Sequence, residues 1–200
     1  MKRRIIVLFL IMVLVSGCSI YKTITNVSRL KFKISSVTDF KVAGIPIENK
    51  KSIKDFNTVD ALKLSSAFFG GKLPAQFTIY IEAKNPNDGK GGYPSTNITL
   101  ESLPYKLYID GKETVSGDIS KKVTVPGVGE STRIPLRVGI DLLRFFKDKG
   151  YNQLINLALA LGGRDGTTSR LKLVAQPVIG TPLGKIKYPQ QITIVDYKFN

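Results

Sequence analysis

Strict alternation of apolar and other side chains is the feature that most narrows what this chain can fold into. The clearest case is residues 134–140, where isoleucine, leucine, valine and isoleucine are separated by proline, arginine and glycine. Successive side chains of a strand point to opposite faces, so this spacing predicts strands with one buried face. The same pattern recurs in residues 30–35, 77–84 and 105–110.

Weaker patterns add strands, turns and helices. Further short strands are predicted at residues 39–45, 123–125, 171–175 and 191–199, and Asp110-Gly111 predicts a hairpin turn. Residues 58–69 have a helical period, in which Val59, Leu62, Ala67 and Phe69 share a stripe flanked by Leu64 and Phe68. Asp141 can cap another short helix, which Gly150 can break.

The segment Tyr151–Leu161 is predicted to form a helix that is apolar on most of its sides. Two interpretations remain for it. The simpler one is a lid that covers an open end of the core. The other is an element that touches a membrane or covers a ligand.

These elements define the expected fold class. About seven or eight short strands without a strand–helix–strand rhythm favour a mainly β protein, an antiparallel fibronectin-like or immunoglobulin-like β-sandwich with two or three short helices. The hydrophobic content of 42% argues against a disordered chain. We expect residues 30–200 to form a single domain.

The N-terminus has a different character. Three basic residues at positions 2–4 precede an apolar run that ends near Val15, which is the pattern of a secretory signal. The run is shorter than the roughly 17 to 25 residues of a membrane-spanning helix. It ends in Val15-Ser16-Gly17-Cys18, which resembles a bacterial lipobox, and Cys18 is the only cysteine in the chain. The alternative is an ordinary exported segment with a chance cysteine.

The lipobox predicts a lipoprotein. Residues 1–17 would be removed as the signal peptide, Cys18 would carry acyl chains such as palmitate, and residues 18–29 would form the lipidated N-terminus and tether. Two or three acyl chains hold a protein stably on a membrane. Ser19, with no aspartate at that position, suggests the periplasmic face of the outer membrane if the host is Gram-negative.

The net charge bears on the partners. The whole chain is +15, and without the three basic residues of the signal it is 27 − 15 = +12. Export argues against nucleic acid as a partner, so an anionic envelope surface is the candidate partner. The alternative is a solubilising charge spread over all faces.

The sequence does not indicate an enzyme. There is no histidine, so a Ser-His-Asp triad is impossible. The stretches GVGESTR and GGRDGTT lack the ending of a phosphate-binding loop. With Cys18 acylated, we expect no zinc or copper site and no cofactor.

One segment carries a resemblance to a known family. Residues 75–117 contain Asn85-Pro86-Asn87 after a strand, then Leu103-Pro104-Tyr105, then the turn Asp110-Gly111. In this order the stretch resembles the second subgroup of late embryogenesis abundant proteins, the WHy (water stress and hypersensitive response) domain. The resemblance covers roughly residues 30–165 and implies a fibronectin-like sandwich.

The resemblance implies a role for the domain but no catalytic residues. It points to a non-enzymatic, lipid-anchored cell-envelope protein that protects in desiccation, osmotic or cold stress. The alternatives are a binding module for a lipid or other apolar ligand, and an assembly partner in an envelope complex. Pro86 cannot donate to a strand ladder and asparagines bond to nearby backbone, so we expect the Asn85–Asn87 motif to be structural.

Overall fold

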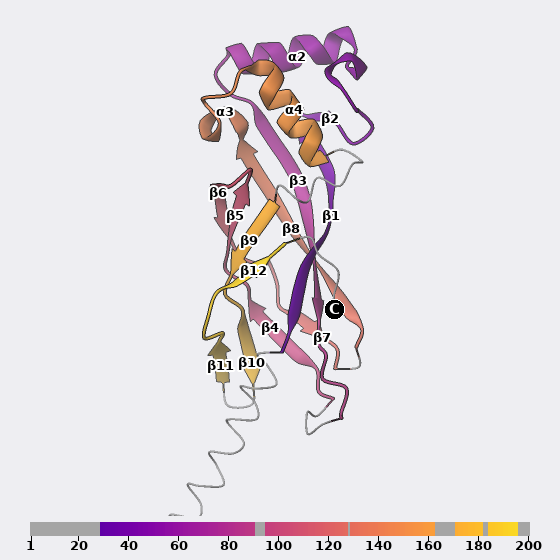
Figure 1. The fold of residues 1–200 in the computed structure, drawn as a ribbon, viewed down its shortest axis with the longest axis vertical. Coiled ribbons are helices and arrows are strands. Elements are labelled where there is room, and N and C mark those ends of the chain that lie inside the picture. Colours follow the sequence, from indigo (N-terminus) through magenta and orange to yellow (C-terminus); the bar gives the residue numbers. More distant parts are fainter. Residues whose placement is uncertain (1–28, 91–94, 128, 163–170, 182–183, 196–200) are drawn as a thin grey trace, which may run out of the picture.

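The computed structural model describes residues 29–90, 95–127, 129–162, 171–181 and 184–195. The signal peptide expected at residues 1–17, Cys18, and all of the tether except Arg29 lie outside the described residues. The described part is mainly β, with antiparallel strands and short helices (Figure 1). The fold class expected from the sequence is therefore confirmed.

The first layer is a four-stranded antiparallel sheet with the order β2-β1-β3-β8. Its longest pair is β3 (Pro74–Lys84) and β8 (Ser131–Asp141), which are in register from Pro74↔Asp141 to Lys84↔Ser131. Along β8 the buried positions are Ile134, Leu136, Val138 and Ile140. The alternation in the sequence thus gives one core face and one outer face.

The strand β1 corrects the prediction for residues 30–45. Two strands were expected, but Lys31–Val42 form one strand, and β2 is only Ile45–Pro46. The pairing of β1 with β3 shifts register between Ile34 and Ser36 and again between Thr38 and Lys41. Asp39 takes a left-handed φ of 56° there, which aspartate tolerates better than most residues. These bulges break the alternation without ending the strand.

The second layer consists of two short sheets that continue one another. One has the order β12-β9-β5-β6, the other β11-β10-β4-β7. The link from β4 (Ile98–Ser102) to β5 (Tyr105–Ile109) lies opposite the link from β9 (Leu171–Ala175) to β10 (Val178–Thr181), where Tyr105 pairs with Ala175 and Ser102 with Val178. The two sheets are thus halves of one bent layer.

The outer strands of the bent layer are short. They comprise β6 (Lys112–Gly117), β7 (Val123–Val125), β11 (Gly184–Lys187) and β12 (Ile192–Ile194). The structure thus has more strands than the sequence predicted, and β4, β6, β10 and β11 lie outside every predicted strand. The β10–β11 pair was not predicted, and only Ile192–Ile194 of the strand expected at 191–199 is strand, with residues 196–200 outside the described part.

The two layers meet along their edges. The Ile34 amide of β1 donates to the Val195 carbonyl after β12 (3.1 Å). The Thr132 hydroxyl of β8 donates to the Thr124 carbonyl of β7 (3.2 Å). The core between the layers is one cluster of buried aliphatic and aromatic side chains.

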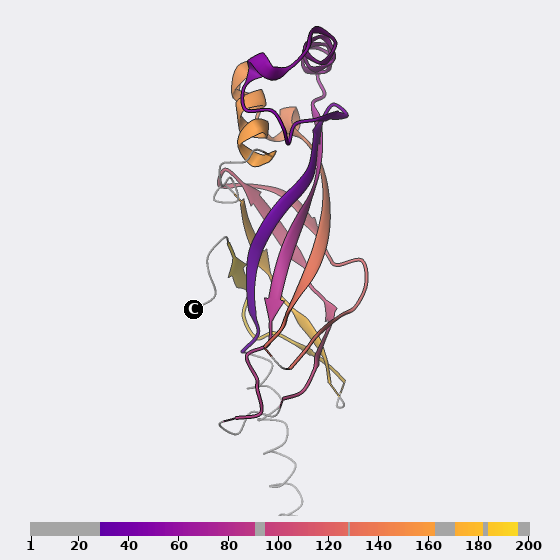
Figure 2. The same cartoon turned by 90° about the vertical axis from the view of Figure 1, so that its right-hand side faces the viewer.

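The helices gather at one end of the sandwich, which we call the helical end (Figures 1 and 2). They are the 3-10 turn η1 (Ile53–Asp55), α2 (Thr58–Phe69), α3 (Leu142–Phe145) and α4 (Tyr151–Gly162). Arg29 and the end of β3 lie at the other end, which we call the strand end, because Lys31 pairs with Lys84. None of the helices in the described ranges has the length and apolar character needed to span a bilayer.

The helix α4 lies across the core. Its Leu154, Ile155, Leu157, Ala158, Leu159 and Leu161 are buried, and Gly162 lies against Phe40 and Ile47. This burial is the arrangement of a lid over the core, the simpler of the two interpretations of this segment.

Candidate functional site

The motif Asn85-Pro86-Asn87 lies at the strand end, directly after β3. Both asparagine side chains are buried, with 0% of each residue exposed. Asn85 Oδ1 accepts a hydrogen bond from the Asn87 amide (3.1 Å), and Asn85 Nδ2 donates to the Thr96 carbonyl (2.9 Å). Asn85 thereby holds the turn after β3 against the segment that leads into β4.

Asn87 connects this turn to the start of the fold. Its Oδ1 accepts a hydrogen bond from Arg29 Nη1 (3.0 Å). The first described residue is thus held beside the end of β3. These contacts are those of a strand-end turn, and the structural role of the motif stays a prediction that mutation can test.

Leu103-Pro104-Tyr105 forms the bend between the two halves of the second layer. The Asp118 carboxylate accepts hydrogen bonds from the Leu103 amide and from the Ser102 hydroxyl (2.6 Å to the latter). The Pro104 carbonyl accepts one from the Gln176 amide (3.0 Å). Burial, and then the Asp118 charge, raise the pKa of Tyr105. The Tyr105 phenol therefore stays uncharged, as suits a side chain that packs in the core.

Asp110-Gly111 forms the expected hairpin turn between β5 and β6. The two residues have φ values of 51° and 80°, as a type I′ turn requires. The Asp110 carboxylate lies 3.6 Å from Lys149 Nζ, on the link between α3 and α4. The structure therefore leaves the motif residues in three separate places, and it does not bring them together into a site. Among the residues described, no three side chains of the metal-binding types form a group.

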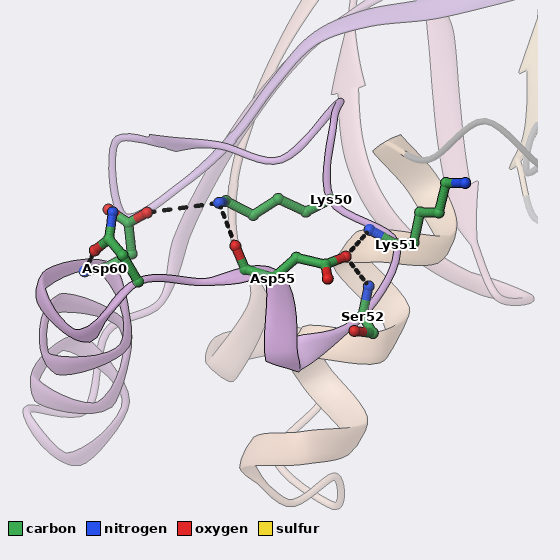
Figure 3. A network of polar contacts seen from close by, with 6 residues as sticks. Lys50, Lys51, Ser52, Asp55 and Asp60 are labelled. Atoms are coloured by element: carbon green, nitrogen blue, oxygen red, sulfur yellow. Dashed lines mark hydrogen bonds and ion pairs between the residues drawn. The ribbon is translucent and has the colours of Figure 1, made fainter.

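A different feature of the surface stands out: the helix α2. The segment before it is fixed by polar contacts (Figure 3). The Asp55 carboxylate accepts hydrogen bonds from the Lys51 and Ser52 amides (2.7 and 2.9 Å), and these bonds lower the pKa of Asp55. Lys50 Nζ donates to the Asp55 carbonyl (2.8 Å) and lies 3.7 Å from the Asp60 carboxylate.

The start of α2 is capped by Asn57, whose Oδ1 accepts from the Asp60 amide (2.7 Å). One face of the helix packs inward through Leu64, which is 1% exposed. The Phe68 ring meets the Tyr151 ring of α4 edge to face, with centroids 5.4 Å apart. The inward face is thus carried by two residues that only flank the stripe seen in the sequence.

Most of the stripe faces outward, although Ala67 is half-buried against the core. Val59, Leu62 and Phe69 are 59%, 65% and 82% exposed, and they are the large hydrophobic residues left exposed in the described chain. Residues three and seven apart share a face of an α-helix, so the three side chains form one surface, which we call the α2 face. An apolar helix stripe normally packs on the core; here it does not.

The α2 face borders a shallow groove of about 610 Å³ at the end of the first sheet. The residues that line it come from α2, from the turn after β1 and from the start of β3: Ala43, Val59, Leu62, Lys63, Ser66, Ala67 and Pro74. The lining is mostly apolar, and Lys63 is its charged member. The sequence predicted the helix and its apolar stripe, but it did not show whether the stripe faces the core or the solvent.

The acidic and basic side chains near the α2 face differ in their contacts with the rest of the protein. Glu48 accepts from the Phe40 amide (3.2 Å), and Asp55 and Asp60 are held by the contacts described above. The side chains of Lys54, Lys63 and Lys72 are exposed, and no ion pair involves them within the described ranges. Residues 48–72 contain five lysines and three acidic residues, 5 − 3 = +2, so the surroundings of the α2 face are net basic.

Comparison with known proteins gives few matches. No family model matches this chain, and no curated protein matches it. Several solved structures resemble it, and two of them show how weak the similarity is. The crystal structure of a protein from Archaeoglobus fulgidus is 12% identical, with a TM-score of 0.33, and the match covers 85% of this chain and 97% of that chain.

The second is the solution structure of a protein from Arabidopsis thaliana. It is 16% identical, with a TM-score of 0.31 and 86% of each chain covered. Scores this low support no conclusion about the fold or the function of this chain.

Proposed function

We propose that this chain is a lipid-anchored, non-enzymatic protein of the cell envelope that works through contact at its surface. The observation that carries the proposal is the α2 face, where Val59, Leu62 and Phe69 are exposed together on a capped helix. Grouped exposed apolar side chains are typical of interaction surfaces. The proposed anchor is Cys18, which follows the signal in the Val15–Cys18 box.

The resemblance to the WHy family supplies the biological context of the proposal. A domain of this kind would shield proteins or membranes during desiccation, osmotic or cold stress. The proposed location is the outer membrane, on its periplasmic face, in a Gram-negative host. The partner in this proposal is an anionic surface of the envelope, which suits the positive net charge.

An apolar-ligand carrier is the second candidate. It requires a space beneath α4, where the helix would cover the ligand. Burial of Leu154, Leu157 and Leu161, with Gly162 against Phe40 and Ile47, favours a helix that fills its site with its own side chains. We therefore rank the contact function above the carrier.

The anchor is tested with Cys18→Ser in cells. The expected result is an uncleaved precursor without acyl chains, detected by mass spectrometry and by loss of labelling with a palmitate analogue. Mature protein of normal size that still enters the detergent phase would contradict the lipobox. Cells with Cys18→Ser should also survive drying less well than cells with the unaltered chain, at equal protein level.

A further inference from the structure

The α2 face groups exposed apolar side chains on a helix that lies at the extreme of one end of the molecule. In Figure 1, α2 runs across the long axis at the extreme of the helical end. Leu64 and Phe68 hold its inner side, so Val59, Leu62 and Phe69 lie on the rest of its circumference. A flat surface that meets this end of the molecule would meet the helix along its length.

The charges around the α2 face favour an anionic surface. The exposed Lys63 lies on α2 itself, Lys54 lies on η1 just before it, and Lys72 lies just after it. The nearby Asp55 and Asp60 are occupied by backbone amides and by Lys50 (Figure 3). Apolar side chains of a helix with lysines on and beside it are typical of elements that lie in the interface of an anionic bilayer.

Another possible occupant, a second copy of the chain, fits less well. A second copy of the chain would bring together two molecules that each carry a large positive charge, +15 for the whole chain, and such charges repel. Stable dimers also bury about 1,200 Å² or more in all, whereas the exposed apolar surface here comes from three side chains. A bilayer requires neither a matched shape nor a large contact area.

We propose that the α2 face docks on an anionic phospholipid bilayer, with Leu62 and Phe69 inserted among the acyl chains and Lys63 at the headgroups. Arg29, next to the tether, lies at the strand end, so the docked bilayer is the one opposite the proposed lipid anchor. The position of the docked bilayer opposite the anchor rests on the proposed function. Docking of the α2 face on an anionic bilayer does not.

The absence of tryptophan from the chain allows a direct test. Phe69→Trp gives the lipidated, full-length mature protein a single tryptophan on the α2 face. The protein is loaded onto donor vesicles of phosphatidylcholine. Acceptor vesicles contain phosphatidylglycerol and brominated phosphatidylcholine, which quenches tryptophan on contact. Docking is expected to quench and blue-shift the emission with anionic acceptors, and to do neither with neutral ones.

Matched variants identify the groups involved. Gln190→Trp, in the exposed turn before β12, should not be quenched. In the Phe69→Trp protein, Leu62→Ser should weaken binding to acceptors by about tenfold or more, as expected for loss of one inserted leucine. Lys63→Glu should weaken it about tenfold, whereas Lys187→Glu, the same charge change on the exposed β11, should change it far less.

The outcomes separate this proposal from the lipid anchor. Protein that floats with the donors but is not quenched by anionic acceptors overturns the docking and leaves the anchor standing. Protein that is quenched by the acceptors but does not float with the donors supports the docking and contradicts the anchor. A blue shift that grows with protein concentration in the absence of acceptors shows that a second copy covers the α2 face, and overturns the docking.

Discussion

Asn85 and Asn87 place polar side chains in the interior at the point where β3 ends. Burying an amide is costly unless its hydrogen bonds are made. The bonds from Asn87 N to Asn85 Oδ1, from Asn85 Nδ2 to the Thr96 carbonyl, and from Arg29 to Asn87 Oδ1 meet that requirement. The two residues thereby connect the first described residue, the end of β3 and the approach to β4.

Asn85→Ala is expected to lower the free energy of unfolding by about 1 to 3 kcal/mol, because the buried Asn87 amide loses its acceptor. Asn152→Ala, an exposed asparagine on α4, is the control and should change the free energy by less than about 0.5 kcal/mol. Both values come from urea unfolding. Equal stability of the Asn85→Ala protein, together with loss of protection in cells, would make the motif a site instead of a structural turn.

Tyr188 is another buried residue with a polar group, and its ionisation limits the stability of the protein at alkaline pH. Burial raises its pKa from 10.0 to about 12, and a hydrogen bond with the Leu30 backbone opposes the rise. A raised pKa means that the folded state favours the neutral phenol. Its contribution to stability is therefore complete below pH 10.0 and is lost as the pH rises towards about 12.

In Tyr188→Phe this titration is removed. Over that alkaline window the variant should lose about 2 kcal/mol less stability than the unaltered protein, because a difference of one in pKa corresponds to about 1.4 kcal/mol. Urea unfolding at stepped alkaline pH gives the comparison. Parallel stability curves for the two proteins would show that Tyr188 ionises equally well in the folded and unfolded states.

At the scale of elements, α2 and α4 differ in how many of their side chains are buried. Both are 12-residue helices at the same end of the molecule. Six side chains of α4 are buried, whereas in α2 only Leu64 is. Within α2, Leu64 is buried and Leu62 is 65% exposed, so a leucine in a helix does not by itself indicate packing.

A pair of leucine substitutions measures this difference. Leu157→Ser on α4 should lower the free energy of unfolding by about 3 kcal/mol or more, since Leu157 is 3% exposed and buried leucine truncations cost about 2 to 5 kcal/mol. Leu62→Ser on α2, where Leu62 is 65% exposed, should change it by less than about 0.5 kcal/mol. Urea unfolding of both variants checks this, and equal losses would mean that the α2 face packs in solution.

The sequence was informative wherever one local rule decided the structure. Alternation predicted β3, β5 and β8 but not β4, and the Asp110-Gly111 dipeptide predicted its hairpin. The prediction of two separate strands failed at β1, because the bulges near Ile34 and Asp39 interrupt the alternation inside one strand. Alternation also missed the β10–β11 pair, whose Gly180 and Gly184 leave little periodicity to read.

The candidate site could be predicted only in part. Periodicity showed that Val59, Leu62 and Phe69 share a face, but tertiary contacts decide the direction of that face. The ring contact between Phe68 and Tyr151, which are 83 residues apart (151 − 68), holds the Phe68 side of α2 inward. The side with Val59, Leu62 and Phe69 is therefore left to face solvent. No local pattern contains that information.

For the whole molecule, the balance of charge sets the response to acid. The pKa values of several carboxyl groups are held below their ordinary values: Asp55 by backbone amides, Glu82 by the Ser131 hydroxyl, Glu101 by Lys122 and Glu113 by Lys106. A lowered pKa means that the contribution to stability is present above the ordinary values, 3.8 for Asp and 4.5 for Glu, and is lost as the pH falls below them.

The free energy of unfolding should therefore decline from about pH 4.5 downward. With every carboxyl protonated, the formal charge would rise from +15 to +30, so added sodium chloride should restore part of the stability by screening the repulsion. Urea unfolding across this pH range, at two salt concentrations, measures both effects. A stability that stays constant down to pH 3 would contradict the assignment of these ion pairs and hydrogen bonds.

The direction of the strands in the first sheet determines how the molecule would carry a mechanical load. β3 begins directly after α2, at the helical end, and its antiparallel neighbour β1 begins at the strand end, next to Arg29. Tension applied between these two ends pulls β1 and β3 past each other along their own axes. Backbone hydrogen bonds between strands lie across that direction, so many of them must yield together, whereas a sideways pull on an edge strand breaks them one after another. The sandwich is therefore built to be stiff along its length and to open from its edges.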